Sequence, residues 1–342
     1  MSDVTIYTLA KELNMTASMV SRAFNPEAKI SEEKRKTVLA AAKKYNFSPN
    51  RMASRLSMRT VQIGIVINAR FAAGADKMVS GIESAYEKLK DYKVKYDIVR
   101  MNPIENKSED YVKELNKLKK YDGVILTGMS SAKYTGMING LYKENPNIVQ
   151  VQAINNEANY LFASKHDEEI ASKLAAEFLY NCIKRSERKN ILLFTGEKES
   201  AVHASAGAAF CRECNEYGLK ILDCIDMKDN EEYFRGIIPD VFRKYGEEAD
   251  GIYITSGISS ALCEYMDENK IDLPFVGFDT YEEIKKYMEK GIVSSTIAQN
   301  VSKQMETAFE MLVEHIITGR VYSKIVHTDV QLVLKSNMHQ FE

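Results

Sequence analysis

Three short stretches near the start of the chain place apolar residues at every third or fourth position. This spacing predicts three amphipathic helices, each with one buried face. A hydroxyl side chain that can cap the free amides of a first turn precedes each stretch. Asn14-Met15 provides the turn between the first two helices, and Asn25-Pro26 ends the second. The expected caps are Thr5, Thr16 and Ser31, and the expected core residues are Leu9, Ala10, Leu13, Val20, Phe24, Val38, Leu39, Ala42 and Tyr45.

From residue 61 onward, short apolar runs alternate with longer amphipathic stretches. This alternation predicts an α/β fold, in which parallel sheets carry helices on both faces. Nine strands are many for one sheet and the pattern breaks near Tyr160, so two lobes are expected, facing each other across a cleft lined by strand ends. The expected strands are 61–67, 94–99, 123–127, 148–151, 190–195, 219–225, 251–255, 274–278 and 293–297, and the expected helices include 78–90, 168–183, 204–217 and 301–317.

The segment between these two parts is polar and has few apolar residues. Met52, Ala53 and Leu56 lie at helical spacing within it, so it would form a helix only when another surface covers that face. The chain is therefore expected to have an all-α head, a hinge and a two-lobed α/β body. The expected bounds are 1–47 for the head, 48–60 for the hinge, 61–160 plus 292–322 for the first lobe of the body, and 161–291 plus 323–342 for the second lobe.

Charge is divided unevenly between the head and the body. Residues 1–60 contain 11 Lys and Arg against 5 Asp and Glu, whereas the rest of the chain contains 35 against 43. Basic surfaces gain affinity for nucleic acid by displacing counterions from phosphates, and the same phosphates repel an acidic body. A charged face that only contacts water is the alternative. Here the basic charge coincides with a pattern typical of a helix-turn-helix, whose second helix enters the DNA major groove.

Composition narrows the remaining classes of protein. No stretch approaches the roughly 20 apolar residues of a membrane span, and the polar N-terminus lacks a signal-peptide core, so a cytoplasmic protein without membrane contact is expected. Five cysteines, an odd number, argue against a disulfide framework. Cys211 and Cys214 form a C-x-x-C inside a predicted helix and are assigned to packing. No metal or cofactor is expected.

Sequence patterns of common enzymes are absent. The chain has no G-x-S-x-G elbow, no G-x-x-x-x-G-K-S/T phosphate loop and no H-E-x-x-H, and its five histidines lie at no metal spacing. No enzymatic activity is therefore expected. A solute-binding or chemoreceptor module would suit the body, but it would need an export signal and would have no use for a basic head.

Several motifs occur together along the chain. The head carries V-T-I-Y at 4–7, V-S-R at 20–22, A-A-K-K-Y-N-F-S-P-N at 41–50 and N-x-x-A-x-x-L at 50–56, and the body carries I-G-I-V at 63–66, S-G-I-E at 80–83, D-G-V-I-L at 122–126, V-G-F-D at 276–279 and S-S-T-I-A-Q at 294–299. In these motifs the chain resembles the LacI/GalR family of bacterial transcriptional regulators. The resemblance implies a repressor that binds a roughly palindromic double-stranded operator as a homodimer, or as a tetramer built from it. It also implies a periplasmic-binding-protein-like sensor domain.

The start of the second helix is expected to meet base edges. Ala17 can offer only an apolar contact to a thymine methyl, and Ser18 one ambiguous hydrogen bond. Arg22 can donate to both guanine acceptors and should carry most of the discrimination, unless it contacts a phosphate instead. Tyr7 suits either kind of contact, and Lys29 adds charge alone. The short donors expected on phosphates are Thr5, Thr16, Ser21, Asn25 and Ser31.

The hinge pattern matches the family at Asn50, Ala53 and Leu56. The resemblance implies that two hinge helices pair in the minor groove and that Leu56 from each wedges open the central base step. Such an apolar wedge costs base stacking, but it bends the duplex so that more of the DNA contacts the protein. The alternative is that Leu56 packs on the body.

The resemblance implies a small polar effector, a sugar or a sugar derivative, held between the lobes. Asp279 is the strongest candidate ligand because it directly follows a predicted strand, although it could also cap the helix that starts near Thr280. Whether the effector releases the operator or strengthens its binding stays open. The candidate effector residues are Asn68, Arg70, Phe71, Asp167, His203, Ser256, Asp279 and Gln299.

Two departures from the family pattern fall in this region. An arginine that usually grips sugar oxygens is replaced by Ala204, and an Asn-Asp pair is replaced by Ser256-Gly257. His203, beside the first gap, could partly substitute. The loss of two side chains that bind hydroxyls argues against a plain hexose as the effector. The alternatives are another polar metabolite or a pocket that has lost its function.

Overall fold

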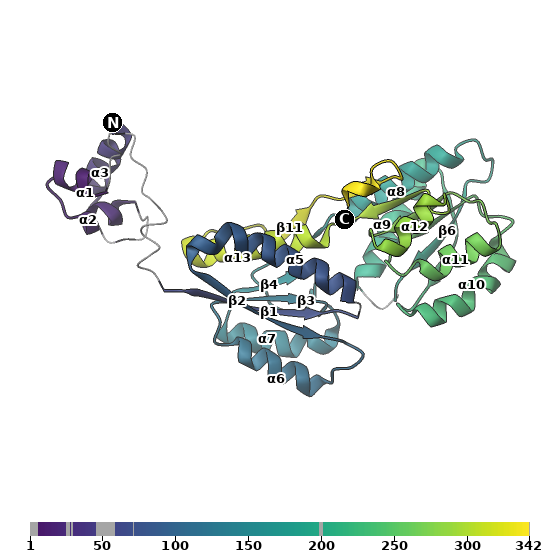
Figure 1. Ribbon diagram of the computed structural model, residues 1–342, viewed down its shortest axis with the longest axis horizontal. Helices are drawn as coiled ribbons and strands as arrows, with labels where there is room; N and C mark the ends of the chain where they lie inside the picture. Colours follow the sequence, from purple (N-terminus) through teal and green to yellow (C-terminus); the bar gives the residue numbers. More distant parts are fainter. Residues whose placement is uncertain are drawn as a thin grey trace. The chain divides into compact units, whose positions relative to one another are not determined.

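The computed structural model describes residues 6–24, 28, 30–45, 59–70, 72–197 and 201–341. The chain divides into two compact units, a small N-terminal one and a large one that begins at Val61. Figure 1 labels the helices and strands of both units. None of the described helices is both long and apolar enough to span a lipid bilayer.

Three helices make up the described part of the small unit. They are α1 (Ile6–Glu12), α2 (Ala17–Ala23) and α3 (Glu32–Lys44). Their buried residues are Leu9, Ala10, Val20, Ala23, Val38 and Ala42. Thr16 caps α2 as predicted, since its hydroxyl accepts a hydrogen bond from the Met19 amide at 3.2 Å. Ser31 stands at the N-cap of α3, but its side chain accepts no capping hydrogen bond.

One predicted core position of the small unit is wrong. Leu39 is 44% exposed. Val38 and Ala42, four residues apart, occupy the buried face of α3. Because each residue turns an α-helix by about 100°, Leu39 is rotated away from that face. Phe24, expected in the core, is half-buried at the end of α2.

The first lobe of the large unit is built on a six-stranded sheet. All of its pairings are parallel, in the order β11-β5-β4-β3-β1-β2. Helices α5 and α13 lie on one face, and α6 and α7 lie on the other (Figure 1). The elements are β1 (Val61–Asn68), α5 (Ala72–Leu89), η1 (Lys90–Tyr92), β2 (Val94–Met101), α6 (Ser108–Leu118), β3 (Gly123–Thr127), η2 (Ala132–Tyr134), α7 (Thr135–Glu144), β4 (Ile148–Val151), β5 (Phe162–His166), α13 (Val301–Thr318) and β11 (Ile325–Thr328).

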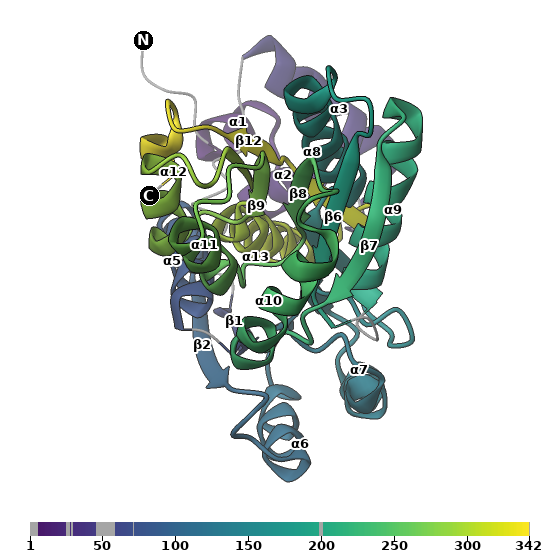
Figure 2. The ribbon, with the colours of Figure 1, turned by 90° about the vertical axis from the view of Figure 1, so that its right-hand side faces the viewer.

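The second lobe repeats this plan with one difference. Its sheet has the order β12-β10-β9-β8-β6-β7, and the short edge strand β12 runs antiparallel to β10. Apolar residues of α8 and α9 pack on one face, and those of α10, α11 and α12 pack on the other. Figure 2 looks towards this lobe. The elements are α8 (Glu168–Ile183), β6 (Asn190–Thr195), α9 (Ala201–Tyr217), β7 (Lys220–Asp226), α10 (Glu231–Tyr245), β8 (Gly251–Ile254), α11 (Ser260–Glu268), β9 (Phe275–Phe278), α12 (Glu282–Glu289), β10 (Ser295–Ala298), β12 (Gln331–Val333) and η3 (Met338–Gln340).

The chain passes from one lobe to the other at three points, here called crossings. The predicted lobe boundaries, 61–160 plus 292–322 and 161–291 plus 323–342, are wrong at all three of them. The first lobe keeps β5 and β11, and the second lobe keeps β10. The chain therefore crosses after each of these strands rather than before it. Tyr160, where the pattern breaks, is a buried residue of the first lobe's own core. The break marks the loop that enters β5, and polar residues within β5 hid the strand behind it.

Candidate functional site

Most of the predicted effector residues lie just beyond the carboxyl ends of strands. Ligands of parallel α/β sheets bind at that edge. The positions are Asn68 at the end of β1, Arg70 two residues later, Asp167 after β5, Ser256 after β8, Asp279 after β9 and Gln299 after β10, with His203 in the first turns of α9. Phe71 lies outside the described residues.

Asp279 is held firmly by its own lobe. Its amide donates to the carbonyl of Ile297 at 2.8 Å, and its carbonyl accepts from the Thr296 hydroxyl at 2.7 Å. Its φ of 69° lies in the left-handed region, which Asp tolerates better than most residues. Gln299 Nε2 donates to Asp279 Oδ2 at 3.0 Å. The structure thus brings the two predicted residues Asp279 and Gln299 into direct contact.

Burial dominates the electrostatics of Asp279. Removal from water disfavours the charged carboxylate and raises the pKa of Asp279 to about 6. The hydrogen bond from Gln299, the charge of Lys77 and a hydrogen bond from Tyr281 act in the opposite direction. The carboxyl group is therefore poised to change its charge near neutral pH.

Lys77, which the sequence reasoning did not single out, reaches this group from the first lobe. Its Nζ donates to the backbone carbonyl of Thr280 at 3.1 Å and to the Thr280 hydroxyl at 3.3 Å. The same Nζ lies 5.1 Å from the centre of the Tyr281 ring, which is within the range of a cation–π contact. Burial lowers the pKa of Lys77, against the attraction of Asp279.

Asp229 organises a second contact between the lobes. His203 Nε2 lies 3.1 Å from Asp229 Oδ2, and Arg70 Nη1 donates to the Asp229 backbone carbonyl at 2.7 Å. Burial favours the neutral acid, but the hydrogen bond and charge of His203, a backbone hydrogen bond at Glu197 and the charge of Arg70 outweigh it and lower the pKa of Asp229. The predicted residues Arg70 and His203 therefore meet at Asp229, which the sequence reasoning missed because it lies in a loop after β7.

Three predicted residues are occupied by structural bonds within their own lobes. Asn68 Nδ2 donates to the Gly128 carbonyl at 2.6 Å, and Asn68 Oδ1 accepts from the Tyr111 hydroxyl at 2.7 Å. Asp167 Oδ1 caps α8 by accepting from two backbone amides. Ser256 Oγ accepts from the Ile258 amide at 3.4 Å. These side chains support the loops around the site.

His166 was also missed, although it ends β5 beside the first crossing. Its ring centre lies 5.6 Å from that of Phe278, the last residue of β9. Burial lowers the pKa of His166 to about 4, and its Nδ1 has no hydrogen-bond partner among the described residues. A hydrogen bond with Gln299 connects it to the group around Asp279. The only signal in the sequence was its place at the end of a strand that was itself missed.

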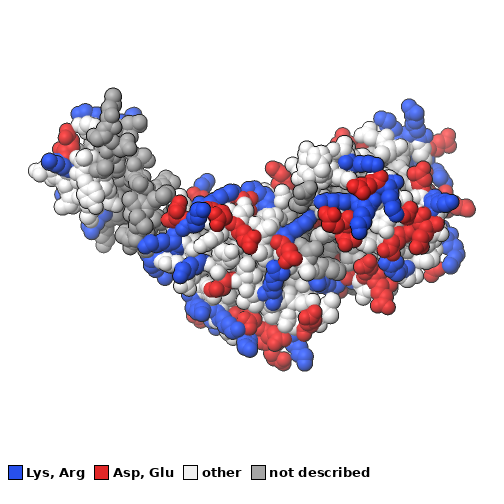
Figure 3. Space-filling model, viewed as in Figure 1, with Lys and Arg blue, Asp and Glu red and all other residues white. Residues whose placement is uncertain are grey.

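The small unit exposes most of the described DNA-contact candidates. Tyr7, Thr16, Ser18, Ser21, Arg22 and Ser31 are exposed, and Ala17 is half-buried against the core. Ser18, Ser21 and Arg22 all belong to α2. The remaining candidates, Thr5, Asn25, Lys29, Asn50, Ala53 and Leu56, lie outside the described residues. On the face of the large unit visible in Figure 3, acidic and basic side chains are intermixed.

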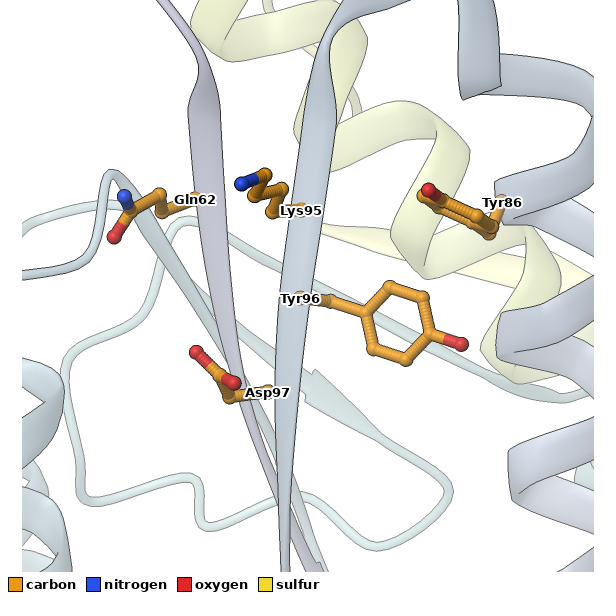
Figure 4. A pocket seen from close by; sticks show the side chains of 5 residues that line it. All are labelled: Gln62, Tyr86, Lys95, Tyr96 and Asp97. Carbon is orange, nitrogen blue, oxygen red and sulfur yellow. The ribbon is translucent and has the colours of Figure 1, made fainter.

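A surface pocket of about 340 Å³ lies at the opposite end of the first lobe, near the starts of β1 and β2. Figure 4 shows Tyr86 and Tyr96 on one side of β2 and Gln62, Lys95 and Asp97 on the other. The two tyrosine rings are 5.2 Å apart in a T-shaped pair. This pocket is remote from the carboxyl ends of the strands and is not part of the interlobe site.

Four of the five cysteines pack in or against the cores of the second lobe, and Cys182 is exposed. All five are free thiols, and Cys214 is fully buried in the core of the second lobe. Burial raises the pKa of both Cys211 and Cys214, which makes their thiolates less available. Within the described ranges, no three His, Cys, Asp or Glu side chains come together as a metal site would require.

The large unit is similar to known proteins in both sequence and fold. Residues 63–320 match the family described as the periplasmic binding protein domain. Two solved structures share the fold. A glucose-galactose binding protein from Geobacillus stearothermophilus has a TM-score of 0.70 at 17% identity, covering 82% of this chain and 99% of that one. An arabinose binding protein from the same species has a TM-score of 0.71 at 16% identity, covering 83% and 100%.

Curated relatives extend the comparison to regulators. Catabolite control protein A of Priestia megaterium is 26% identical, covering 69% of this chain and 68% of its own length. Catabolite control protein B of Bacillus subtilis is 27% identical, with coverages of 80% and 84%. The HTH-type transcriptional regulator pepR1 of Lactobacillus delbrueckii is 26% identical, with coverages of 75% and 74%.

The family match defines the class of protein: the chain belongs to the periplasmic binding protein domain family. Within that class its curated relatives make it a transcriptional regulator of the LacI/GalR family.

Proposed function

We propose that the protein represses transcription by binding a pseudo-palindromic operator as a homodimer through its N-terminal unit. The observation that carries this proposal is the exposed face of α2, where Ser18, Ser21 and Arg22 lie together in a strongly basic segment. Exposed short donors and a guanidinium on one helix suit a major-groove reader. The acidic charge of the rest of the chain favours docking by the basic end alone.

Individual residues take different roles in this proposal. Arg22 donates to guanine, while Thr16, Ser21 and Ser31 hold the phosphates and set the register. Thr5, Asn25 and Lys29 would join them at the same backbone. The hinge segment with Asn50, Ala53 and Leu56 becomes helical on the operator, and Leu56 enters the minor groove as a wedge.

A small polar metabolite, a sugar or a sugar derivative, is proposed as the effector between the lobes. Asp279 and Gln299 supply one end of its site, and Arg70 and His203 the other. The similarity to sugar-binding proteins and the contacts across the lobes support this placement. The effector changes operator affinity only through its different affinity for the two lobe arrangements.

A selection from a random duplex library at moderate ionic strength tests the proposal. The full-length protein should enrich a two-fold symmetric motif. Enrichment of no sequence would contradict operator binding, and sugar binding without duplex binding would instead indicate a solute-binding module.

The role of Arg22 can be tested with the selected operator. Arg22→Ala should cost about 1–3 kcal/mol and relax specificity at one position of each half-site, because a bidentate base contact is lost. Titrations of a set of single-base variants, with wild type and Arg22→Ala in parallel, measure both effects. If Arg22→Ala weakens every duplex equally, Arg22 contacts a phosphate rather than a base. Lys36→Ala, an exposed charge on α3 outside the candidate contacts, is the matched control.

A further inference from the structure

One group of residues joins the lobes where α5 meets the connection between β9 and α12. This group, the Lys77 cluster, consists of Lys77 from the first lobe and of Asp279, Thr280 and Tyr281 from the second. The Lys77 ammonium has two oxygen acceptors on Thr280, at 3.1 and 3.3 Å, and an aromatic face at 5.1 Å. No carboxylate in the described chain lies within ion-pair distance of it. Lys77 therefore binds the other lobe chiefly through neutral acceptors.

Gly257 makes room for Tyr281 in this cluster, and Gly74 lies beside its hydroxyl. A Cβ atom at Gly257 would lie 2.7 Å from Tyr281 Cε2 and 3.4 Å from Asp279 Oδ2. A Cβ atom at Gly74, on α5 of the first lobe, would lie 3.7 Å from the Tyr281 hydroxyl. The ring thus rests against the backbone of Gly257 and extends towards α5. Gly257 is one of the two positions at which the family resemblance implied a polar pair, and here the Tyr281 ring takes up the space.

The carboxylate of Asp279 is enclosed by groups of its own chain. Gln299 donates to it at 3.0 Å, Tyr281 lies beside it, and only 9% of the residue is exposed. A sugar hydroxyl that donates to this carboxylate must reach it, and the burial of Asp279 leaves little of the residue accessible.

We propose that Lys77 and Tyr281 act as an internal substitute for a ligand at the Asp279 end of the interlobe site. Lys77 bridges the lobes and Tyr281 covers Asp279, so an effector reaches this carboxylate only by displacing them. The two residues thereby determine which ligands the site accepts. The proposal rests on the proposed function for the identity of the site, but the bridge itself is measurable without DNA or effector.

Hydrogen exchange on the full-length protein tests the bridge. Lys77→Met keeps the length of the side chain and removes the ammonium, so the lobes should separate more often. The amides of residues 280–285 should then exchange several-fold faster than in wild type, and small-angle scattering should give a larger radius of gyration. Lys77→Arg, which retains a cation and donors, should restore slow exchange in this segment.

Lys88→Met is the matched control, because Lys88 lies on the same helix but pairs with Glu306 and Glu310 of its own lobe. It should leave the exchange of residues 280–285 unchanged. Wild-type exchange and dimensions in folded Lys77→Met would overturn the proposal, as would equal effects of Lys77→Met and Lys88→Met. Lys77→Ala replaces Lys77→Met if the latter does not fold. A failed operator selection would reject the proposed function and leave these results unaffected.

Discussion

Two buried ionisable residues that both contact Gln299 have pKa values shifted in opposite directions. The pKa of Asp279 is raised from 3.8 to about 6, and that of His166 is lowered from 6.5 to about 4. Burial is the main cause in both cases, because it disfavours the charged form of each group. Both residues are therefore held neutral over a range of pH in which the unfolded chain would carry charge.

These shifts make opposite contributions to stability as pH changes. The contribution of Asp279 is fully present below pH 3.8 and is lost as pH rises through about 6. The contribution of His166 is present above pH 6.5 and is lost as pH falls through about 4. In wild type the two trends largely cancel between these limits.

Removal of either residue should reveal the trend of the other. As pH rises from 4 to 6, the unfolding free energy of Asp279→Asn should increase by about 2 kcal/mol relative to wild type. Over the same range, the unfolding free energy of His166→Asn should decrease by a similar amount relative to wild type. Urea unfolding across this range measures both slopes. At pH 8 neither pKa shift makes the unfolding free energy depend on pH. Measurements there give the stability that each substitution loses through altered packing alone. Parallel profiles for wild type and both variants would refute the opposed shifts.

At the scale of the element, α8 shows how a predicted ligand can serve as a helix cap. Asp167 Oδ1 accepts hydrogen bonds from the amides of Glu169 and Ile170 at 3.0 and 3.1 Å. A carboxylate also interacts favourably with the helix dipole at this end. The helix starts directly at the first crossing between the lobes, so its cap also fixes the direction of the connection.

Loss of this cap should destabilise the protein measurably. Asp167→Ala should lower the unfolding free energy by about 1 kcal/mol, whereas Asp167→Asn, whose side-chain oxygen can still accept, should retain most of it. Thermal or urea unfolding of the three proteins compares them. A loss as large in Asp167→Asn as in Asp167→Ala would show that capping is not the reason.

Sequence patterns located the elements whose residues are uniformly apolar and buried. The strands β3, β4 and β6 have their predicted bounds because every residue in them is buried. The strands β5 and β11 were missed because each contains charged or polar residues that break the apolar run. Helix α5 begins six residues before its predicted start at Met78, since its first turns are rich in alanine and glycine.

Local sequence patterns likewise predicted some residues of the candidate site and not others. Asp279 and Gln299 were found because each directly follows a strand. Lys77 and Tyr281 were not found, because the contact between them depends on how two lobes pack and leaves no local pattern. The sequence showed that Ser256-Gly257 departs from the Asn-Asp pair of the family. The physical reason, the packing of the Tyr281 ring against Gly257, is visible only in the structure.

At the scale of the whole large unit, an ionic group fastens α13 to α5 although more than 200 residues separate them in sequence. Glu306, 8% exposed, accepts from Ser84 at 2.9 Å and from Lys303 at 2.8 Å, and also pairs with Lys88. Burial alone would raise the pKa of Glu306, but these partners lower it to about 2. The contact ties the chain that returns from the second lobe to the first lobe.

The ionic group should make the protein sensitive to acid. Because the pKa of Glu306 falls from 4.5 to about 2 on folding, its contribution is complete above pH 4.5 and is lost as pH falls through about 2. The half-exposed partner Lys88 reduces this contribution to on the order of 1 kcal/mol. Glu306→Gln should therefore lose less stability than wild type between pH 4.5 and 2, as followed by circular dichroism. An unchanged acid transition would contradict the assignment.

The three crossings between the lobes have a mechanical consequence. With one connection, the lobes could separate widely or swap between molecules, whereas three connections limit how far they can separate. A protease that nicks one connection would leave both halves tethered by the other two, so the nicked protein should stay in one piece until it is denatured.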